Sequence, residues 1–83
     1  MKGHKKYRRD LEDTARRVAQ EESVEFVQMF TGGSDHLRFE FRVGAHITTS
    51  TAAATPKNPD HGLNFARQQM RRAIVAEKNR QRG

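Results

Sequence analysis

The sequence contains no cysteine, and its longest apolar runs extend over only a few residues. Without cysteine the chain can form neither a disulfide framework nor a Cys-ligated zinc site. The short apolar runs predict that no helix spans a membrane, and no apolar segment of the kind that secretory signals require follows the basic N-terminus. We therefore expect one small domain, residues 1–83, in the reducing environment of the cytoplasm.

Acidic residues are scarce at both ends of the chain. Overall, 16 lysines and arginines face 10 acids, which gives a net charge of +6. Residues 2–17 hold seven basic residues against three acids, and residues 67–82 hold six against one. Between them, residues 18–66 hold three basic residues against six acids. Two basic ends predict a polyanionic partner, most commonly nucleic acid, although a merely solvated basic surface is the alternative.

Residues 6–20 are predicted to form a helix with one apolar stripe. Its acids and bases are spaced four residues apart, so most of its positive charge is balanced by its own carboxylates. Lys5 and Lys6 have no such partners in this pattern and are candidate phosphate contacts, together with the basic arm of residues 1–5. The predicted stripe consists of Tyr7, Leu11, Ala15 and Val18.

A second helix is predicted from Asn58, the N-cap, to about Asn79, with residues 79–83 as a frayed basic tail. A connector at residues 52–57 precedes it. Arg67, Arg71 and Arg72 lie off its apolar stripe and have almost no acidic neighbours along the helix, so they are candidates for a ridge that follows phosphates. The stripe consists of Leu63, Ala66, Met70, Ala73 and Ile74.

Three segments between the helices, residues 24–31, 35–43 and 45–51, have the composition of β-strands. The second is the clearest, because apolar and polar residues alternate strictly from Leu37 to Val43. In the first segment both faces are partly apolar, which predicts a central strand. Its two apolar sets are Val24, Phe26 and Phe30 on one face, and Val27 and Met29 on the other.

The pairing of the last two strands follows from placing Ile47 in the core. Phe41 then faces Ile47, Arg42 faces His46, and residues 43–45 form a three-residue loop in which Gly44 adopts the left-handed conformation. The predicted outer face of the sheet consists of His36, Arg38, Glu40, Arg42, His46, Thr48 and Ser50.

These elements predict an α+β fold in the order α-β-β-β-α, with a three-stranded antiparallel sheet and both helices on one face. In the predicted register His46 lies ~20 Å along the sheet from His36, too far for a shared proton transfer. The four histidines show no ligand spacing, so we predict no metal site.

The segment Gly33-Ser34-Asp35-His36-Leu37, followed by an alternating strand and later by the helix that starts at Asn58, resembles the HicA family of small toxins, in particular its phage and prophage branch. The resemblance extends over about residues 24–76. It implies a double-stranded-RNA-binding-like fold and mRNA cleavage by one histidine, which falls on His36, without metal or small-molecule cofactor. It also implies a HicB-like antitoxin as partner, in the cytoplasm of a bacterial host.

Histidine suits such cleavage because its pKa lies near the working pH and it can take the proton of the ribose 2′-hydroxyl. Arg38 lies two residues further on the same face and is expected to hold the scissile phosphate. The predicted RNA contacts are Gly33, Ser34, Arg38, Arg42, Arg67, Arg71, Arg72, Lys5 and Lys6.

Two other functions agree with the same residues. The first is a nucleic-acid-binding phage or prophage accessory protein that uses the same basic surfaces without catalysis. The second is a protein-interaction module that accepts a partner on its open sheet face or on the edge of its third strand. For the single residues, the non-functional alternatives are a plain surface histidine at position 36 and solvated arginines.

Overall fold

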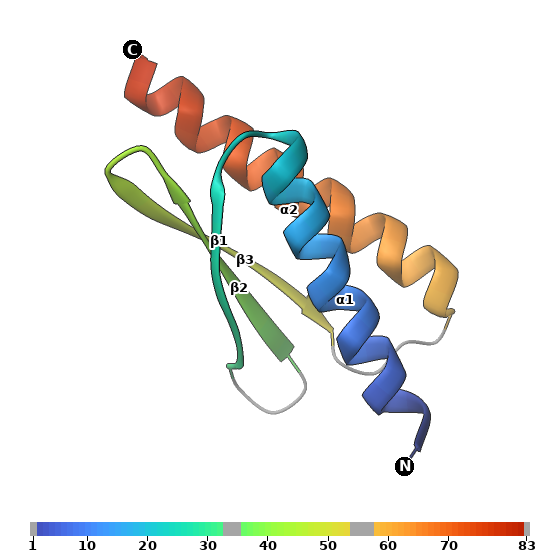
Figure 1. The fold of residues 1–83 in the computed structure, drawn as a ribbon. Coiled ribbons are helices and arrows are strands. Elements are labelled where there is room, and N and C mark those ends of the chain that lie inside the picture. Colours follow the sequence, from blue (N-terminus) through green and yellow to red (C-terminus); the bar gives the residue numbers. More distant parts are fainter. Residues whose placement is uncertain (1, 33–35, 54–57, 83) are drawn as a thin grey trace.

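The computed structural model describes residues 2–32, 36–53 and 58–82. It confirms the α-β-β-β-α order and the antiparallel sheet (Figure 1). The elements are α1 (Lys2–Glu21), β1 (Glu25–Thr31), β2 (His36–Val43), β3 (His46–Ala53) and α2 (Pro59–Arg82).

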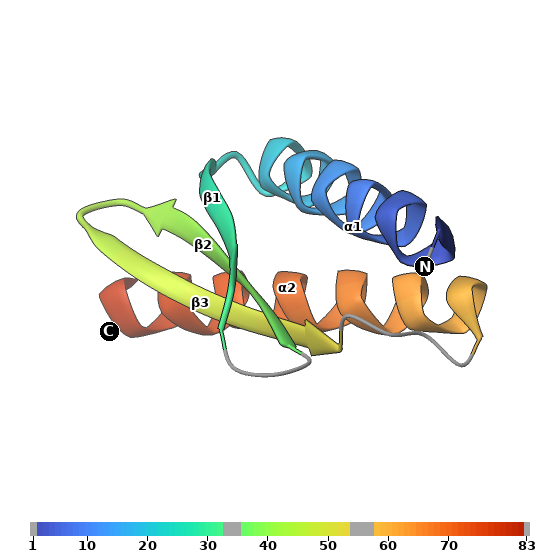
Figure 2. The same ribbon diagram turned by 90° about the horizontal axis from the view of Figure 1, so that it is seen from below.

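Both helices lie on the same face of the sheet, and the opposite face is open (Figures 1 and 2). Helix α2 packs against β2 and β3, whereas α1 packs against β1 and α2. Phe39, Phe41 and Leu37 of the middle strand are buried beneath the helices, and the two predicted helical stripes meet them. The remaining core residues are Tyr7, Leu11, Ala15, Val18, Ala19, Val43, Ala66, Met70 and Ile74. Neither helix, over the residues that the structure describes, is apolar enough to cross a membrane.

Helix α1 begins earlier than predicted, because residues 2–5 continue its first turns instead of forming a free arm. Its end is a Schellman motif, in which the Val24 amide donates to the Ala19 carbonyl over 2.8 Å and the Ser23 amide donates to Gln20. Ser23 takes the left-handed conformation that this motif requires, with φ of 59°. Glycine usually fills this position, so the cap holds a serine in a costly conformation.

The prediction that the first strand is central is wrong, because the strand order is β1-β2-β3 and β1 is an edge. The pairing with β2 is interrupted by a bulge between Phe26 and Gln28. Beyond this bulge the faces of β1 exchange, and Met29 instead of Phe30 packs against the core opposite Phe39. Both faces of β1 therefore contain apolar residues because of the bulge, not because two layers cover the strand.

The predicted register of β2 and β3 is wrong by one residue. Val43 pairs with His46, so the loop has two residues, with Gly44 at φ of 64° in its first position as a type II′ turn requires. Ile47 consequently lies opposite Arg42 on the outer face and is 45% exposed. The open face of β3 shows Ile47, Thr49, Thr51 and Ala53, whereas Thr48, Ser50 and Ala52 face the helices.

Helix α2 is tied down at both ends. Asn58 caps its start, as predicted, by accepting a hydrogen bond from the His61 amide over 3.2 Å. At the far end the side-chain amide of Gln81 donates to the Val43 carbonyl beside the β2–β3 turn. The prediction of a frayed tail at residues 79–83 is therefore wrong for residues 79–82, which are helical to Arg82.

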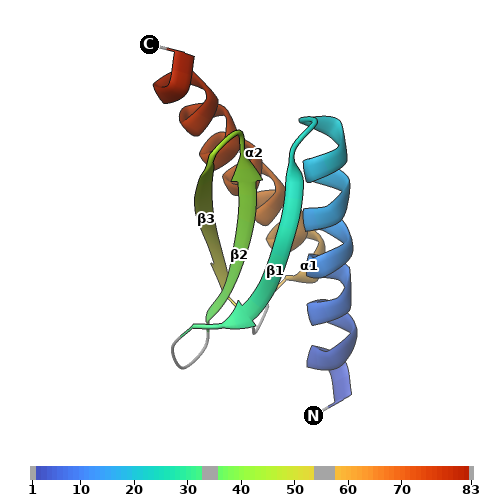
Figure 3. The same cartoon turned by 60° about the vertical axis from the view of Figure 1, so that its left-hand side comes forward.

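The strand pairing shows which end of the sheet lies near the start of α1 and which lies near the end of α2 (Figure 3). Thr31, His36 and Ala53 come together at the end where α1 begins. The β2–β3 turn lies at the other end, where α2 finishes. His36 therefore lies at the end of the sheet that the basic first turns of α1 approach.

Candidate nucleic-acid interface

His36 is the first residue of β2 and its side chain is exposed on the open face of the sheet. Its backbone is held from both sides. It pairs with Ala53 of β3, and its carbonyl accepts a hydrogen bond from the Gly32 amide over 3.0 Å. The imidazole thus projects from fixed backbone at the end of the middle strand, as the sequence predicts.

Arg38 lies on the same open face, two residues along β2 and so ~7 Å from His36. Its side chain crosses Gly32, because a Cβ atom at that glycine would come within 2.7 Å of the Arg38 Cδ and Nε atoms. Gly32 pairs with His36, so the arginine leans toward the histidine end of the sheet. We call His36 and Arg38, with Gly32 between them, the His36–Arg38 corner.

The corner differs from the rest of the open face in its charge balance. Arg42, a predicted RNA contact, donates to the Glu25 carboxylate over 3.2 Å. Glu40 accepts a hydrogen bond from Gln28 over 2.9 Å. Arg38 forms no ion pair with any acid in the described ranges. Positive charge on this face is consequently concentrated at the corner.

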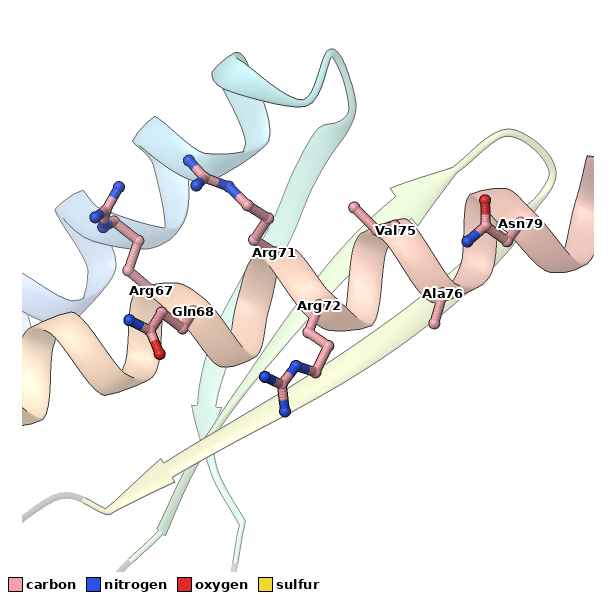
Figure 4. A pocket seen from close by; sticks show the side chains of 7 residues that line it. All are labelled: Arg67, Gln68, Arg71, Arg72, Val75, Ala76 and Asn79. Carbon is pink, nitrogen blue, oxygen red and sulfur yellow. The ribbon is translucent and has the colours of Figure 1, made fainter.

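The three arginines of α2, the predicted ridge, line one pocket but point to different neighbours (Figure 4). Arg71 has no acidic neighbour along α2, as expected, but it reaches Glu21 at 2.7 Å and Glu22 at 3.3 Å on α1. Lys78 adds a hydrogen bond to the Glu22 carbonyl over 2.6 Å. These contacts hold α2 against the end of α1, so Arg71 stabilises the packing of the two helices.

Arg67 and Arg72 differ from Arg71, because neither forms an ion pair with another described residue. Arg67 is half-buried and points toward α1, whereas Arg72 is exposed and points toward β3 (Figure 4). The two free guanidinium groups therefore lie on different sides of α2. Only Arg72 is fully available to an anion that approaches the sheet edge.

Beside Arg72 lies a groove that the sequence interpretation missed. It separates α2 from β3 and contains Phe65, whose side chain is 56% exposed. The available signal was that Phe65 lies off the apolar stripe of its helix, which is unusual for so large an apolar side chain. We call this the Phe65 groove; its lining is Thr49, Ser50, Thr51, Phe65, Gln69, Arg72, Ala73 and Ala76.

The other predicted contacts contribute less to a defined site. Gly33 and Ser34 lie outside the described residues, and Lys5 is described only as part of the helical backbone. Lys6 was expected to be free, but its ammonium group lies 3.3 Å from the Asp10 carboxylate. It is exposed, so the pair is weak and the lysine can still contact a phosphate.

His46 pairs with Val43 beside the β2–β3 turn, at the opposite end of the sheet from His36. The two histidines are therefore distant, as predicted, although the register that led to this prediction was wrong. His61 is exposed in the first turn of α2. Within the described ranges no three potential metal-ligating side chains gather.

The chain matches no family model, no curated protein and no solved structure with which it was compared. The resemblance to the HicA family consequently depends on the Gly33-Ser34-Asp35-His36 motif and on the order of the elements.

Proposed function

We propose that this protein is a small RNA-binding endoribonuclease, similar to HicA toxins, which cleaves mRNA through His36 without a metal ion. The observation that supports the proposal is the His36–Arg38 corner. An exposed imidazole and an arginine without a described acidic partner share the open end of the middle strand. The α-β-β-β-α order agrees with the double-stranded-RNA-binding-like fold that the resemblance implies.

The corner holds the groups that cleavage of a ribose–phosphate linkage needs. The His36 imidazole takes the proton of the 2′-hydroxyl, whose oxygen attacks the adjacent phosphorus atom. The bond from phosphorus to the 5′-oxygen breaks, and that oxygen takes a proton from water or from the imidazolium. Arg38 stabilises the negative charge that develops on the phosphoryl oxygens. The 2′-hydroxyl is required for the attack, so DNA is not a substrate.

The charge distribution supports an RNA partner. The chain has a net charge of +6, and its basic residues concentrate in the two helices. The first turns of α1, where Lys5 and Lys6 lie, add positive charge near the same end of the sheet. A toxin of this kind works in the bacterial cytoplasm, and a HicB-like antitoxin would inhibit it by covering the corner.

Substitution of His36 tests the catalytic part of the proposal. His36→Ala is expected to lower the cleavage rate by at least about 100-fold while RNA affinity is largely retained. His46→Ala is the matched control, because it removes an exposed histidine from the opposite end of the sheet. DNA of the same sequence should stay intact, and RNA products should end in a 2′,3′-cyclic phosphate. Equal cleavage by wild type and His36→Ala would refute the catalytic role.

A second candidate function is RNA binding without catalysis, as in a phage or prophage accessory protein. The observation that favours it is the surroundings of His36, where the described neighbours are Gly32, Arg38 and Ala53. None of them is a histidine or a carboxylic acid, so a second general acid–base group is absent from this described set. Under this function purified wild-type protein binds RNA and never cleaves it, and Arg38→Ala weakens the binding.

A further inference from the structure

Phe65 lies in a groove and its aromatic ring is exposed to solvent there, which is unfavourable for a large apolar side chain. Burial of a phenylalanine side chain stabilises a small domain by roughly 1.5–3 kcal/mol, yet this ring is 56% exposed while smaller residues of α2 are buried. Phe65, Gln69, Arg72 and Ala76 recur at four-, three- and four-residue steps, so they share one face of α2. This face lies beside β3 and forms one wall of the groove.

The opposite wall is the free edge of the sheet. β3 is the last strand in the order β1-β2-β3, so the backbone groups on its outer side have no strand partner among the described residues. Thr49, Ser50 and Thr51 form this wall; Ser50 faces the helices, whereas the two threonine side chains lie on the open face of the sheet. The groove has a volume of about 430 Å³, which lies within the range of small-molecule sites.

The side chains that line the groove favour a ligand that combines a negative charge with a flat apolar ring. The only charged side chain among the lining residues is Arg72, which points toward β3 and forms no ion pair with a described acid (Figure 4). The aromatic ring of Phe65 lies two helical turns away, about 10 Å along the axis. An aromatic ring and an unpaired guanidinium along one groove are the combination by which proteins hold unpaired nucleotides, because every base has a face that stacks.

We infer that the Phe65 groove binds one unpaired nucleotide of an RNA strand. The base stacks on Phe65, Arg72 contacts a neighbouring phosphate, and the Gln69 amide contacts base or ribose. The inference rests on the proposed function for the identity of the polymer, and it adds that the protein selects single-stranded over fully paired RNA. A peptide strand on the β3 edge is the competing occupant, but it gives no reason for an unpaired arginine.

A fluorescent probe at position 65 tests the stacking directly. The chain contains no tryptophan, so Phe65→Trp introduces a single reporter inside the groove. Single-stranded RNA oligonucleotides should quench its fluorescence, and a fully paired duplex of the same sequence should quench it several-fold less at equal concentration. The control is Val75→Trp, because Val75 is 39% exposed on the same helix but points away from β3 (Figure 4).

Affinity measurements give a second, independent readout. Phe65→Ala and Arg72→Ala are each expected to weaken binding of single-stranded RNA by at least about fivefold. Arg82→Ala serves as the matched charge control, because it removes one exposed arginine from the end of the same helix and away from the groove. Circular dichroism of each variant should match wild type, since the side chains at positions 65 and 72 are exposed.

The outcomes separate this inference from the proposed nuclease activity. RNA that binds with Arg38-dependent affinity but quenches neither tryptophan, or both equally, would overturn the groove proposal and leave the His36–Arg38 corner in place. A response to an uncharged extended peptide, without a response to RNA, would assign the groove to a protein strand and also overturn it. Quenching that persists in a variant combining Phe65→Trp with His36→Ala, which does not cleave, would support the groove as a separate subsite.

Discussion

Arg71 and Arg72 are consecutive residues of α2 whose guanidinium groups point to different neighbours (Figure 4). Arg71 reaches across to the end of α1 and contacts Glu21 and Glu22 at 2.7 and 3.3 Å. Arg72 extends toward β3 and forms no ion pair with a described residue. One arginine therefore holds two helices together, whereas its neighbour is free for a ligand.

This relationship predicts opposite effects of the two alanine substitutions. Arg71→Ala should lower the free energy of unfolding by about 1 kcal/mol, since Glu21 loses its partner on α2 and Glu22 keeps only Lys78, and it should change RNA affinity little. Arg72→Ala should leave stability within about 0.5 kcal/mol but weaken RNA binding and reduce its salt slope by about 1. Urea denaturation and affinity measured over a salt series check both. Similar effects of both substitutions on RNA affinity would contradict the assignment of Arg71 to helix packing and of Arg72 to RNA binding.

Gly32 is predicted to control the position of Arg38. A methyl group at Gly32 would lie within 2.7 Å of the arginine Cδ and Nε atoms, and the flexible side chain would have to move aside. Gly32→Ala should therefore change thermal stability little while lowering RNA affinity toward that of Arg38→Ala. The double variant is the control, because Gly32→Ala should add nothing once Arg38 is absent. Additive losses in the double variant would show that the glycine acts by another route.

Tyr7 is predicted to titrate late in the folded protein. It is 5% exposed against α2, and burial raises the pKa of its hydroxyl above the usual value of about 10. The unfolded chain then ionises first, so the free energy of unfolding is unaffected below pH about 10 and falls as the pH rises through the folded-state pKa. Tyr7 is the only tyrosine and the chain has no tryptophan, so near-ultraviolet absorbance reports tyrosinate directly. Identical titration in buffer and in urea would contradict the prediction, and Tyr7→Phe is the control for the fall in stability.

Ser23→Gly is predicted to stabilise the fold. Ser23 holds φ of 59° at the end of α1, a conformation that costs a residue with a Cβ about 1 kcal/mol relative to glycine. The substitution should raise the free energy of unfolding by roughly that amount in urea denaturation. Ser50→Gly offers a contrast, since it introduces the same residue into the β3 strand and should destabilise. A loss of stability in Ser23→Gly would show that the serine makes a contact more valuable than the relief of backbone strain.

The parts of the fold that a local pattern determines were predictable from the sequence. Strict alternation fixed the two faces of β2, and four- and three-residue steps fixed the buried stripes of both helices. His36 was placed on the open face for the same reason. Asn58 was recognised because its capping contact is formed within one helical turn.

The errors concern contacts that no local pattern reveals. Gly44 suits a two-residue turn as well as a three-residue loop, so the choice depended on the assumption that Ile47 is buried, which is wrong. The acids that contact Arg71 lie about 50 residues earlier in the chain, so the spacing of charges along α2 does not reveal them. The end of α2 was placed too early because its anchor, the Val43 carbonyl, belongs to another element.

Ion pairing differs between the two ends of the open sheet face, so the electrostatic potential changes along the strands. At the β2–β3 turn end Glu25 and Glu40 offset or repel an approaching phosphate, and at the other end Arg38 attracts one. A polyanion that approaches the sheet thus experiences a torque as well as an attraction, and is turned before it makes close contact. Association of such a polyanion would then depend on this alignment, and added salt should lower the rate of productive association more than that of simple collision.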